Sequence, residues 1–241
     1  MDNLKTPRET DIERLGRLAF FSWLTPVEIK SLGRSLTTAN WGRGEVIFRE
    51  HTYATEAHML IAGIARITCL NAAKERVTVG LIAPGPIPEL PSLSTSRFEF
   101  CCEAYNNCRV GTLDWKGFTG VTPNGREAAF TRFHHSSVKY WYRLFRRTSG
   151  LLNLDLHERV ALTMLDLSED FGIADARGTL LGIPISHKDI ANIVGASRPR
   201  ITEHLAQMER DKMIIRQGRQ FIINTDELSR SLVARPPNAR S

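Results

Sequence analysis

The stretch of this sequence that most constrains its fold predicts two short amphipathic helices joined by a tight turn. Ser186 and Asp189 have the spacing of a capping box at the start of the first helix, and Gly195 permits a sharp turn at its end. We expect Ser197 to cap the second helix, with Pro199 in its first turn, where the missing N–H does no harm. The apolar stripe of this second helix repeats at helical spacing and consists of Ile201, Leu205 and Met208. The pattern predicts a helix-turn-helix.

A β-hairpin is predicted immediately after the helix pair. Met213 to Arg216 and Gln220 to Ile223 are short β-like runs, and the turn pair Gln217-Gly218 lies between them. Any two amphipathic helices can imitate a helix-turn-helix, so the helix pair alone is a weak signal. A capped helix, a turn glycine, a Ser-Arg opening and a hairpin together are far more specific. They favour a winged helix whose basic tip carries Arg216 and Arg219.

The second predicted helix has a polar side that is free to enter a DNA major groove. At about 100° per residue, Arg198, Thr202 and Glu203 lie opposite the apolar stripe. We expect Arg198 to bond guanine, Glu203 to accept from the cytosine N4 amino group, and Thr202 to contact a thymine methyl or a phosphate. Phosphate contacts are expected from the flanks of the motif, at Ser186, Lys188, Ser197 and Arg200, and the wing residues Arg216 and Arg219 complete the predicted DNA-binding set.

The charge balance suits this partner. The chain carries a formal net charge of +6 and a sequence pI of about 9.4, which favours a polyanion such as double-stranded DNA without proving it. Hydrophobic residues at 42% and charged residues at 24% are ordinary for a soluble globular protein. No apolar run is long enough to span a bilayer, and Met1 to Leu15 lacks the apolar core of a secretion signal. We therefore expect a cytoplasmic protein with no membrane partner.

The cysteines give no sign of a metal or redox site. Cys69, Cys101, Cys102 and Cys108 form no Cys-x-x-Cys pair, and no histidine has zinc-finger spacing. We expect reduced, buried thiols and no metal. No Gly-x-Ser-x-Gly, P-loop or His-Glu-x-x-His motif anchors catalysis either, so we do not expect an enzyme.

Short β-like runs fill the region from Thr38 to Leu113, behind a helical preface from Thr10 to Leu36. In the preface, Thr25-Pro26-Val27-Glu28 has the N-cap, first-turn proline and capping-box glutamate of a helix start. Glycines and prolines separate the β-like runs at a spacing typical of a sandwich or a barrel-like roll. The clearest runs are Glu45 to Phe48, His58 to Ile61, Ala65 to Cys69 and Val77 to Ile82.

Arg126 to Ser149 is the longest interval of the chain without glycine or proline, which predicts a long helix. Its large apolar side chains fall on one broad side: Ala129, Phe133, Val138, Trp141, Leu144 and Phe145. A solvated helix cannot hide this much apolar surface, so we expect the side to pack against a second copy. The alternative, that it only covers its own β-domain, stays open. A further amphipathic helix is predicted from Asn153 to Ser168, followed by a loop bracketed by Gly172 and Gly178.

The segment from Ile185 to Asn224, ISHKDIANIVGASRPRITEHLAQMERDKMIIRQGRQFIIN, resembles the C-terminal domain of the Crp/Fnr family of transcription regulators. The resemblance extends from about residue 12 to 233, with further landmarks at Leu24-Thr-Pro-Val-Glu, Trp41-Gly-Arg-Gly-Glu-Val-Ile-Phe-Arg-Glu, Ile61-Ala-Gly and Leu154-Asp-Leu-His-Glu-Arg-Val-Ala. It implies an α+β protein with a jelly-roll-like, cyclic-nucleotide-binding-like β-roll at 10–118, a dimerisation helix and connector at 119–153, and a winged helix-turn-helix DNA-binding domain at 154–233. It also implies a homodimer that regulates transcription, with RNA polymerase as a partner.

The predicted recognition helix departs from the family at two positions. Arg198 matches the family's guanine-reading arginine, whereas Pro199 replaces a common glutamate and Glu203 replaces a common arginine. We therefore expect the target sequence to differ from the family consensus.

The effector site that the resemblance implies is also altered. The family's phosphate-binding element has glycine before its glutamate and serine or threonine after its arginine, whereas here Pro88 precedes Glu89 and Phe98 follows Arg97. The helix positions that carry adenine-binding hydroxyls in the cyclic-AMP-responsive members are Leu144 and Phe145. Glu89 can still hold a ribose hydroxyl and Arg97 a phosphate. The joint changes nevertheless disfavour cyclic AMP and leave an unknown effector or none.

The sequence also bears on other cofactors and on one other function. The oxygen-sensing members of the family bind an iron–sulfur cluster through N-terminal cysteines, and no cysteine precedes Cys69, so no cluster is expected. A haem ligand stays open among His51, His58, His134 and His135, with a surface or hydrogen-bonded histidine as the simpler interpretation. The alternative function is a ligand-binding regulatory module whose helical end contacts another protein instead of DNA. Lys188, Arg198 and the basic wing argue against it, and salt-dependent DNA binding discriminates between the two.

Overall fold

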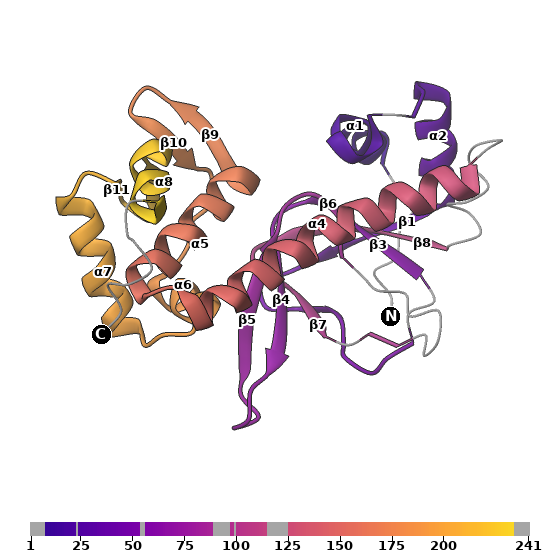
Figure 1. Cartoon of the computed structure of the whole chain (residues 1–241). Coiled ribbons are helices and arrows are strands. Elements are labelled where there is room, and N and C mark those ends of the chain that lie inside the picture. The colour runs from indigo at the N-terminus through magenta and orange to yellow at the C-terminus, as the bar shows by residue number, and fades with distance from the viewer. Residues whose placement is uncertain are drawn as a thin grey trace. The chain divides into compact units, whose positions relative to one another are not determined.

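A computed structural model describes residues 8–22, 24–53, 56–88, 97–98, 100–114 and 125–233. The chain divides into two compact units, Met1–Tyr142 and Arg143–Ser241, whose elements can be followed in Figure 1. A β-rich N-terminal region and a C-terminal region with several helices confirm the predicted α+β class. The finer bounds predicted for the three segments, 10–118, 119–153 and 154–233, stay predictions.

Two short helices open the described part of the first unit. Helix α1 spans Glu9–Arg17, a 3-10 turn η1 spans Ala19–Phe21, and helix α2 spans Pro26–Ser35. The capping box predicted at Thr25 is present: Glu28 N–H donates to Thr25 Oγ1 at 3.3 Å, and Thr25 N–H donates to Glu28 Oε2 at 2.8 Å. These bonds satisfy end groups that the helix itself leaves free, which fixes where α2 begins.

Two antiparallel sheets form the predicted roll. Their strands are β1 Leu36–Trp41, β2 Val46–Phe48, β3 Glu56–Ala62, β4 Ala65–Leu70, β5 Arg76–Ile82, β6 Gly85–Pro86, β7 Cys101–Ala104 and β8 Cys108–Asp114. The strand order is β1-β8-β3-β6 in one sheet and β2-β7-β4-β5 in the other. Side chains of both sheets share one buried cluster, among them Phe48, Leu60 and Val110, so the sheets face each other across a common core.

Aromatic side chains fill part of this core. Phe98 is only 4% exposed and stacks on Phe48, with ring centroids 4.0 Å apart and planes at 19°. Phe100 lies 5.9 Å from Phe48 and 5.4 Å from Trp141, measured between ring centroids. Trp141 and its neighbour Tyr140 belong to the long helix and pack against the same cluster. The roll is therefore closed by side chains from this helix.

The long helix α4 spans Gly125–Asn153, and its first part lies across the roll (Figure 1). The expected division of its apolar residues was partly wrong. Trp141, assigned to the face of a second copy, instead packs on its own roll, whereas Val138 and Phe145 are exposed. Covering of its own roll thus accounts for Trp141, whereas packing against a second copy stays a prediction for the exposed residues. Ala129 and Phe133 lie outside the residues whose side chains the structure describes.

A buried ion pair attaches α1 to the roll. Arg109 of β8 donates to Asp11 through Nη2 at 2.8 Å and through Nε at 3.2 Å, and its Nη1 donates to Asn40 Oδ1 at 3.2 Å. Burial alone raises the pKa of the Asp11 carboxyl, but hydrogen bonds from Arg109 and from the Arg8 backbone N–H outweigh it and hold this pKa below 3.8. Asp11 therefore stays charged and paired at neutral pH.

The second unit combines helices with a third antiparallel sheet. Its elements are α5 Leu156–Phe171, β9 Gly172–Asp175, β10 Gly178–Leu181, α6 His187–Val194, α7 Arg198–Arg210, β11 Ile214–Gln217, β12 Gln220–Ile223 and α8 Thr225–Val233. The sheet has the order β11-β12-β10-β9. No helix in the described part of the chain is long and apolar enough to cross a lipid bilayer.

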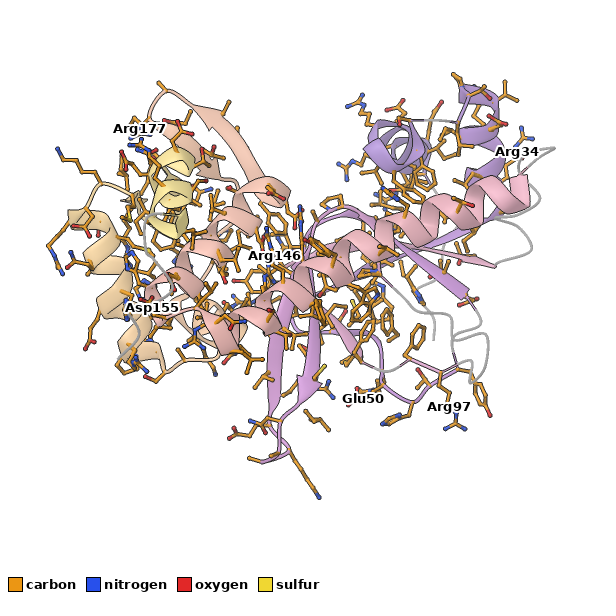
Figure 2. The ribbon with its side chains drawn as sticks, in the orientation of Figure 1. Arg34, Glu50, Arg97, Arg146, Asp155 and Arg177 are labelled. Carbon is orange, nitrogen blue, oxygen red and sulfur yellow. The ribbon has the colours of Figure 1, made fainter. Side chains whose placement is uncertain are left out.

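The loop predicted between Gly172 and Gly178 is a hairpin, so that prediction was wrong. Strand β10 pairs with β12 through Thr179 and Ile223, and β9 pairs with β10. The local sequence is too short and glycine-rich to indicate strands, and the pairing with distant β12 decides its conformation. At the hairpin turn Arg177, labelled in Figure 2, bonds Asp175, and this hydrogen bond lowers the pKa of Asp175 to about 2.

Ion pairs join the end of α4 to α5. Arg143 pairs with Glu169 and Asp170, while Arg146, labelled in Figure 2, and Arg147 both pair with Asp166. The last turns of α4 are therefore joined to α5 by ion pairs within the second unit.

Candidate nucleic-acid interface

The turn between α6 and α7 is built as the sequence predicts. Asp189 N–H donates to Ser186 Oγ at 3.1 Å, and Ser186 N–H donates to Asp189 Oδ2 at 3.3 Å, which completes the capping box of α6. Gly195 ends this helix with φ of 71°, a left-handed conformation that glycine adopts at little cost. These local interactions fix the direction in which α7 leaves the turn.

Ser197 occupies the N-cap position of α7, but its side chain makes no capping hydrogen bond, so the expected cap was only partly right. A capping oxygen accepts from the second or third N–H of a helix; Pro199, the second residue, has none, and the N–H of Arg200, the third, makes no bond to the Ser197 side chain. The Ser197 hydroxyl is therefore not committed to the helix end.

Helix α7 divides into a buried and an exposed side. Ile201, Leu205 and Met208 are buried, as their spacing predicts. The predicted recognition residues Arg198, Thr202 and Glu203 are all exposed, as are Arg200 and the flanking Ser186, Lys188 and Ser197. The polar side of α7 is thus available to a partner while the apolar stripe fixes the helix to the domain.

The wing follows α7 directly. Strands β11 and β12 pair in the register Gln217 with Gln220, which leaves Gly218-Arg219 as a two-residue turn. The predicted turn pair Gln217-Gly218 was therefore one residue too early, because Gln217 pairs in the ladder of β11. Gly218 has φ of 63°, as expected for the first turn residue of a type II′ hairpin. The backbone N–H of Arg216 donates to Glu209 Oε1 of α7 at 3.3 Å, and Arg177 donates to Gln217 Oε1 at 3.0 Å. Arg216 and Arg219 are exposed, and hydrogen bonds to α7 and to Arg177 hold the hairpin that contains them.

His187 is a residue of this surface that the sequence analysis missed. Its Nδ1 lies 2.9 Å from Thr202 Oγ1, and its ring stacks near Phe221 of the wing with centroids 6.4 Å apart. Burial lowers the pKa of His187 below 6.5, and the positive charges of Arg216 and Arg198 lower it further. Only the packing of α6, α7 and β12 brings these groups together, so no sequence spacing could have indicated them.

The residues predicted for an effector have different surroundings. Glu89 lies outside the described residues. Arg97, labelled in Figure 2, is exposed, with its guanidinium 4.8 Å from the centre of the Tyr53 ring and its Nη2 3.4 Å from the Tyr53 hydroxyl. Leu144 is half-buried on α4, and Phe145 is exposed. Phe98, where the family has a small hydroxyl residue, fills the core of the roll.

The cysteines are free thiols, with Cys101, Cys102 and Cys108 buried and Cys69 half-buried. Burial raises the pKa of Cys69, Cys101 and Cys108, which makes their thiolates scarce at neutral pH. Among the described residues, no group of histidine, cysteine and carboxylate side chains has the arrangement of a metal site.

Comparison with known proteins agrees with this architecture. Residues 158–231 match the family model of the Crp-like helix-turn-helix domain. A CRP-like cAMP-activated global transcriptional regulator of Mycobacterium tuberculosis is 21% identical over 220 residues, covering 89% of this chain and 96% of the relative. A global nitrogen regulator of Synechococcus elongatus is 23% identical over 192 residues, covering 78% and 86%.

Solved structures share the fold. FixK2 of Bradyrhizobium japonicum superposes with a TM-score of 0.65 at 19% identity, covering 80% of this chain and 96% of that chain. A CRP-family transcriptional regulator of Thermus thermophilus gives a TM-score of 0.62 at 20% identity, covering 83% and 99%.

The winged helix and these likenesses define a DNA-binding transcription regulator. The relatives named above are likewise transcription regulators and not enzymes. Residues 158–231 carry a Crp-like helix-turn-helix domain, and most of the chain is similar to CRP-like transcription regulators.

Proposed function

We propose that the chain acts in the cytoplasm as a homodimer that binds a pseudo-palindromic DNA site, with α7 of each copy in the major groove of one half-site. The observation that carries this proposal is the exposed row Arg198, Thr202 and Glu203 on α7, above a fully buried apolar stripe and beside a basic wing. Two-fold symmetry then requires two half-sites about one helical turn apart.

The roles of the exposed residues follow from their positions on α7. Arg198 bonds the edge of a guanine, and Glu203 accepts from the amino group of a cytosine. Thr202 lies on the same exposed side of α7 and faces the major groove. Phosphate contacts fall to the groups at the rim: Lys188, Ser197, Arg200, Arg216 and Arg219. Ser186 was also predicted, but its hydroxyl donates to Asp189 in the capping box and has no proton left for a phosphate.

The dimer is proposed to form along α4. Val138, Tyr142, Phe145 and Leu152 are 58%, 65%, 73% and 84% exposed, and they recur at steps of four, three and seven residues. This is the a/d spacing of a coiled coil, which buries such a row against the same row of a second helix. Exposed apolar groups of this size in one line support an interface between two copies.

The effector of the roll is proposed not to be cyclic AMP. Phe98 is buried against Phe48 where the family's phosphate-binding element carries a small hydroxyl residue. Arg97, the proposed phosphate ligand, is occupied with Tyr53. Calorimetry is expected to show no stoichiometric micromolar binding of cyclic AMP, and DNA affinity is expected to change by less than the 1–3 kcal/mol typical of allosteric coupling. A different effector, or none, then controls the protein.

RNA polymerase is proposed as a further partner, because the relatives regulate transcription. Transcription in vitro with the purified polymerase, from a promoter that carries the selected site, tests this and distinguishes activation from repression.

The decisive experiment is a binding-site selection from randomised duplex DNA with the full-length protein, followed by affinity measurements over a range of salt concentrations. We expect one two-fold related sequence, and an affinity that falls linearly with the logarithm of the salt concentration. Selection of no sequence would contradict the proposal. A monomer in sedimentation at micromolar concentration that still binds DNA tightly would contradict its dimeric part.

A further inference from the structure

Thr202 has already made its hydrogen bonds inside the protein. Its Oγ1 donates to the backbone carbonyl of Arg198 at 3.0 Å and lies 2.9 Å from Nδ1 of His187. A hydroxyl has one proton, and the Arg198 carbonyl receives it, so Nδ1 of His187 is the donor in the second bond. The hydroxyl therefore has no proton left to donate to a phosphate or to a base, and the apolar group that Thr202 offers to a partner is its Cγ2 methyl.

The His187 ring is held in the orientation that this bond needs. It is the first residue of α6, and its ring lies at 30° to the ring of Phe221 in β12. Its Nε2 is buried without a hydrogen-bond partner among the described residues. Burial and the charges of Arg216 and Arg198 lower the pKa of His187, so the ring is neutral at pH 7 with its single proton on Nδ1.

We propose that His187 is a positioning residue for base recognition: it holds the Thr202 hydroxyl inward, so that Thr202 presents its methyl group to the major groove and reads the 5-methyl group of a thymine. The inference rests on the proposed function, because it assumes that α7 lies in the groove. The sequence leaves two options for Thr202, a thymine methyl or a phosphate. A hydroxyl held by Arg198 and His187 is unavailable to a phosphate, which leaves the apolar contact.

The test compares thymine with deoxyuridine, which lacks only the 5-methyl group. The full-length protein selects its duplex, and each thymine of the half-site is then replaced in turn by deoxyuridine in both half-sites. At one position the wild type is expected to lose about fourfold in affinity per half-site, the factor that corresponds to burial of one methyl group. T202S is expected to lose this preference and T202V to keep it, because only valine retains the methyl.

Variants of His187 test its positioning role. H187L and H187F keep apolar bulk beside Phe221 but remove the donor, and both are expected to reduce the thymine preference toward that of T202S. H187N is the matched control, because its amide nitrogen lies near the Nδ1 position and can still donate, so it is expected to keep the preference. The double variant H187L/T202V is expected to restore it, since valine presents a methyl group without a hydroxyl to orient.

The inference is overturned if the thymine preference is unchanged in H187L and H187F, or if no thymine distinguishes T202S from the wild type. Unfolding followed by circular dichroism checks each variant. If both apolar variants unfold, H187Q decides, because its amide donor lies near the Nε2 position; an unchanged preference there also overturns the inference. Failure of the proposed function would look different, because the wild type would then select no sequence.

Discussion

Nε of Arg147 lies 2.7 Å from Oδ2 of Asp166, a side chain with no exposed surface. Arg146 binds the other carboxylate oxygen. Both arginines belong to the last turns of α4, and Asp166 belongs to α5. One buried carboxylate therefore links the end of α4, the helix of the proposed dimer face, to α5, the helix on which α6 and α7 pack. Removing it leaves two arginines without the charge they are packed against.

Asp166→Ala is expected to lower the free energy of unfolding by about 3 kcal/mol, the low end for a buried ion pair, because Arg147 is only 14% exposed and loses its partner whereas Arg146, 40% exposed, stays solvated. Asp170→Ala, which removes a carboxylate at the exposed end of the same group, is the control, with an expected loss of about 1 kcal/mol or less. Denaturant unfolding followed by circular dichroism measures both. If both variants lose the same free energy of unfolding, burial of Asp166 adds nothing to the stability that its ion pairs provide.

Arg198 and Arg200 are expected to differ in kind although both are exposed at the start of α7. Arg198→Ala should cost about 1–3 kcal/mol on the selected site and flatten the preference at one guanine per half-site. Arg200→Ala should weaken binding to all DNA sequences alike. It should also reduce the slope of the logarithm of affinity against the logarithm of salt concentration by about one unit per lost phosphate contact. Affinities on cognate and scrambled duplexes at several salt concentrations separate the two. Identical profiles for both variants would contradict the assigned roles.

Glu203 tests the departure from the family. A carboxylate beside phosphates is repelled unless it accepts a hydrogen bond from a cytosine amino group. We expect Glu203→Ala to relax the preference at one base pair of each half-site, and Glu203→Gln to keep part of it, since its amide oxygen still accepts. A site selection that shows higher affinity with an unchanged preference would mean that Glu203 only repels DNA.

The exposed side of α4 is expected to control association and its buried side to control the stability of the roll. Phe145→Glu should weaken the dimer about 10- to 100-fold, because it replaces an apolar contact that occurs in both copies. Trp141→Ala should lower the free energy of unfolding with a smaller effect on association, since Trp141 packs on Phe100. Sedimentation equilibrium and denaturant unfolding of both variants check this. If Trp141→Ala weakens the dimer and Phe145→Glu lowers only the free energy of unfolding, the interface lies on the Trp141 side of α4.

Acidification is expected to destabilise the second unit through His204. Its ring lies 6.0 Å from that of His157, and burial, followed by the charges of His157 and Arg200, lowers the pKa of His204 below 6.5. A lowered folded pKa means that the unfolded chain binds the proton more readily. The contribution of His204 to the free energy of unfolding is therefore fully present above about pH 6.5. It is lost as the pH falls from there through the pKa that His204 has in the folded protein.

His204→Gln should remove part of this pH dependence, and His187, whose pKa is also lowered, should account for a further part. Unfolding curves at about pH 8, 7, 6 and 5 for the wild type, His204→Gln and the double variant with His187→Asn measure both contributions. If the free energy of unfolding of the double variant falls as steeply with pH as that of the wild type, other groups cause the pH dependence.

Features that depend on nearby residues could be predicted from the sequence. The capping boxes at Thr25 and Ser186, the left-handed Gly195 and the buried stripe of α7 each follow from residues within one or two turns of one another. The hairpin of the wing follows similarly from Gly218, although its turn begins one residue later than predicted. The exposed face of α7, and with it most of the candidate site, could therefore be identified before the structure was known.

Features that depend on distant partners could not. Strands β9 and β10 need the edge of β12, and Trp141 faces Phe100 because of how α4 crosses the roll. The periodicity of α4 marks its apolar residues but cannot assign them between two neighbours. His187 is the sharpest case, because its partners Thr202 and Phe221 are 15 and 34 positions away in the chain.

The ion pair between Asp11 and Arg109 joins residues 98 positions apart, and this separation sets an order of events during synthesis. At about 5–20 residues per second, a ribosome takes on the order of 5–20 s to add the residues between them. Helix α1 is made first, yet it has no arginine to dock on until β8 has left the ribosome. Its apolar side can pack on α2 as soon as both are made, but its carboxylate stays without this partner until that moment.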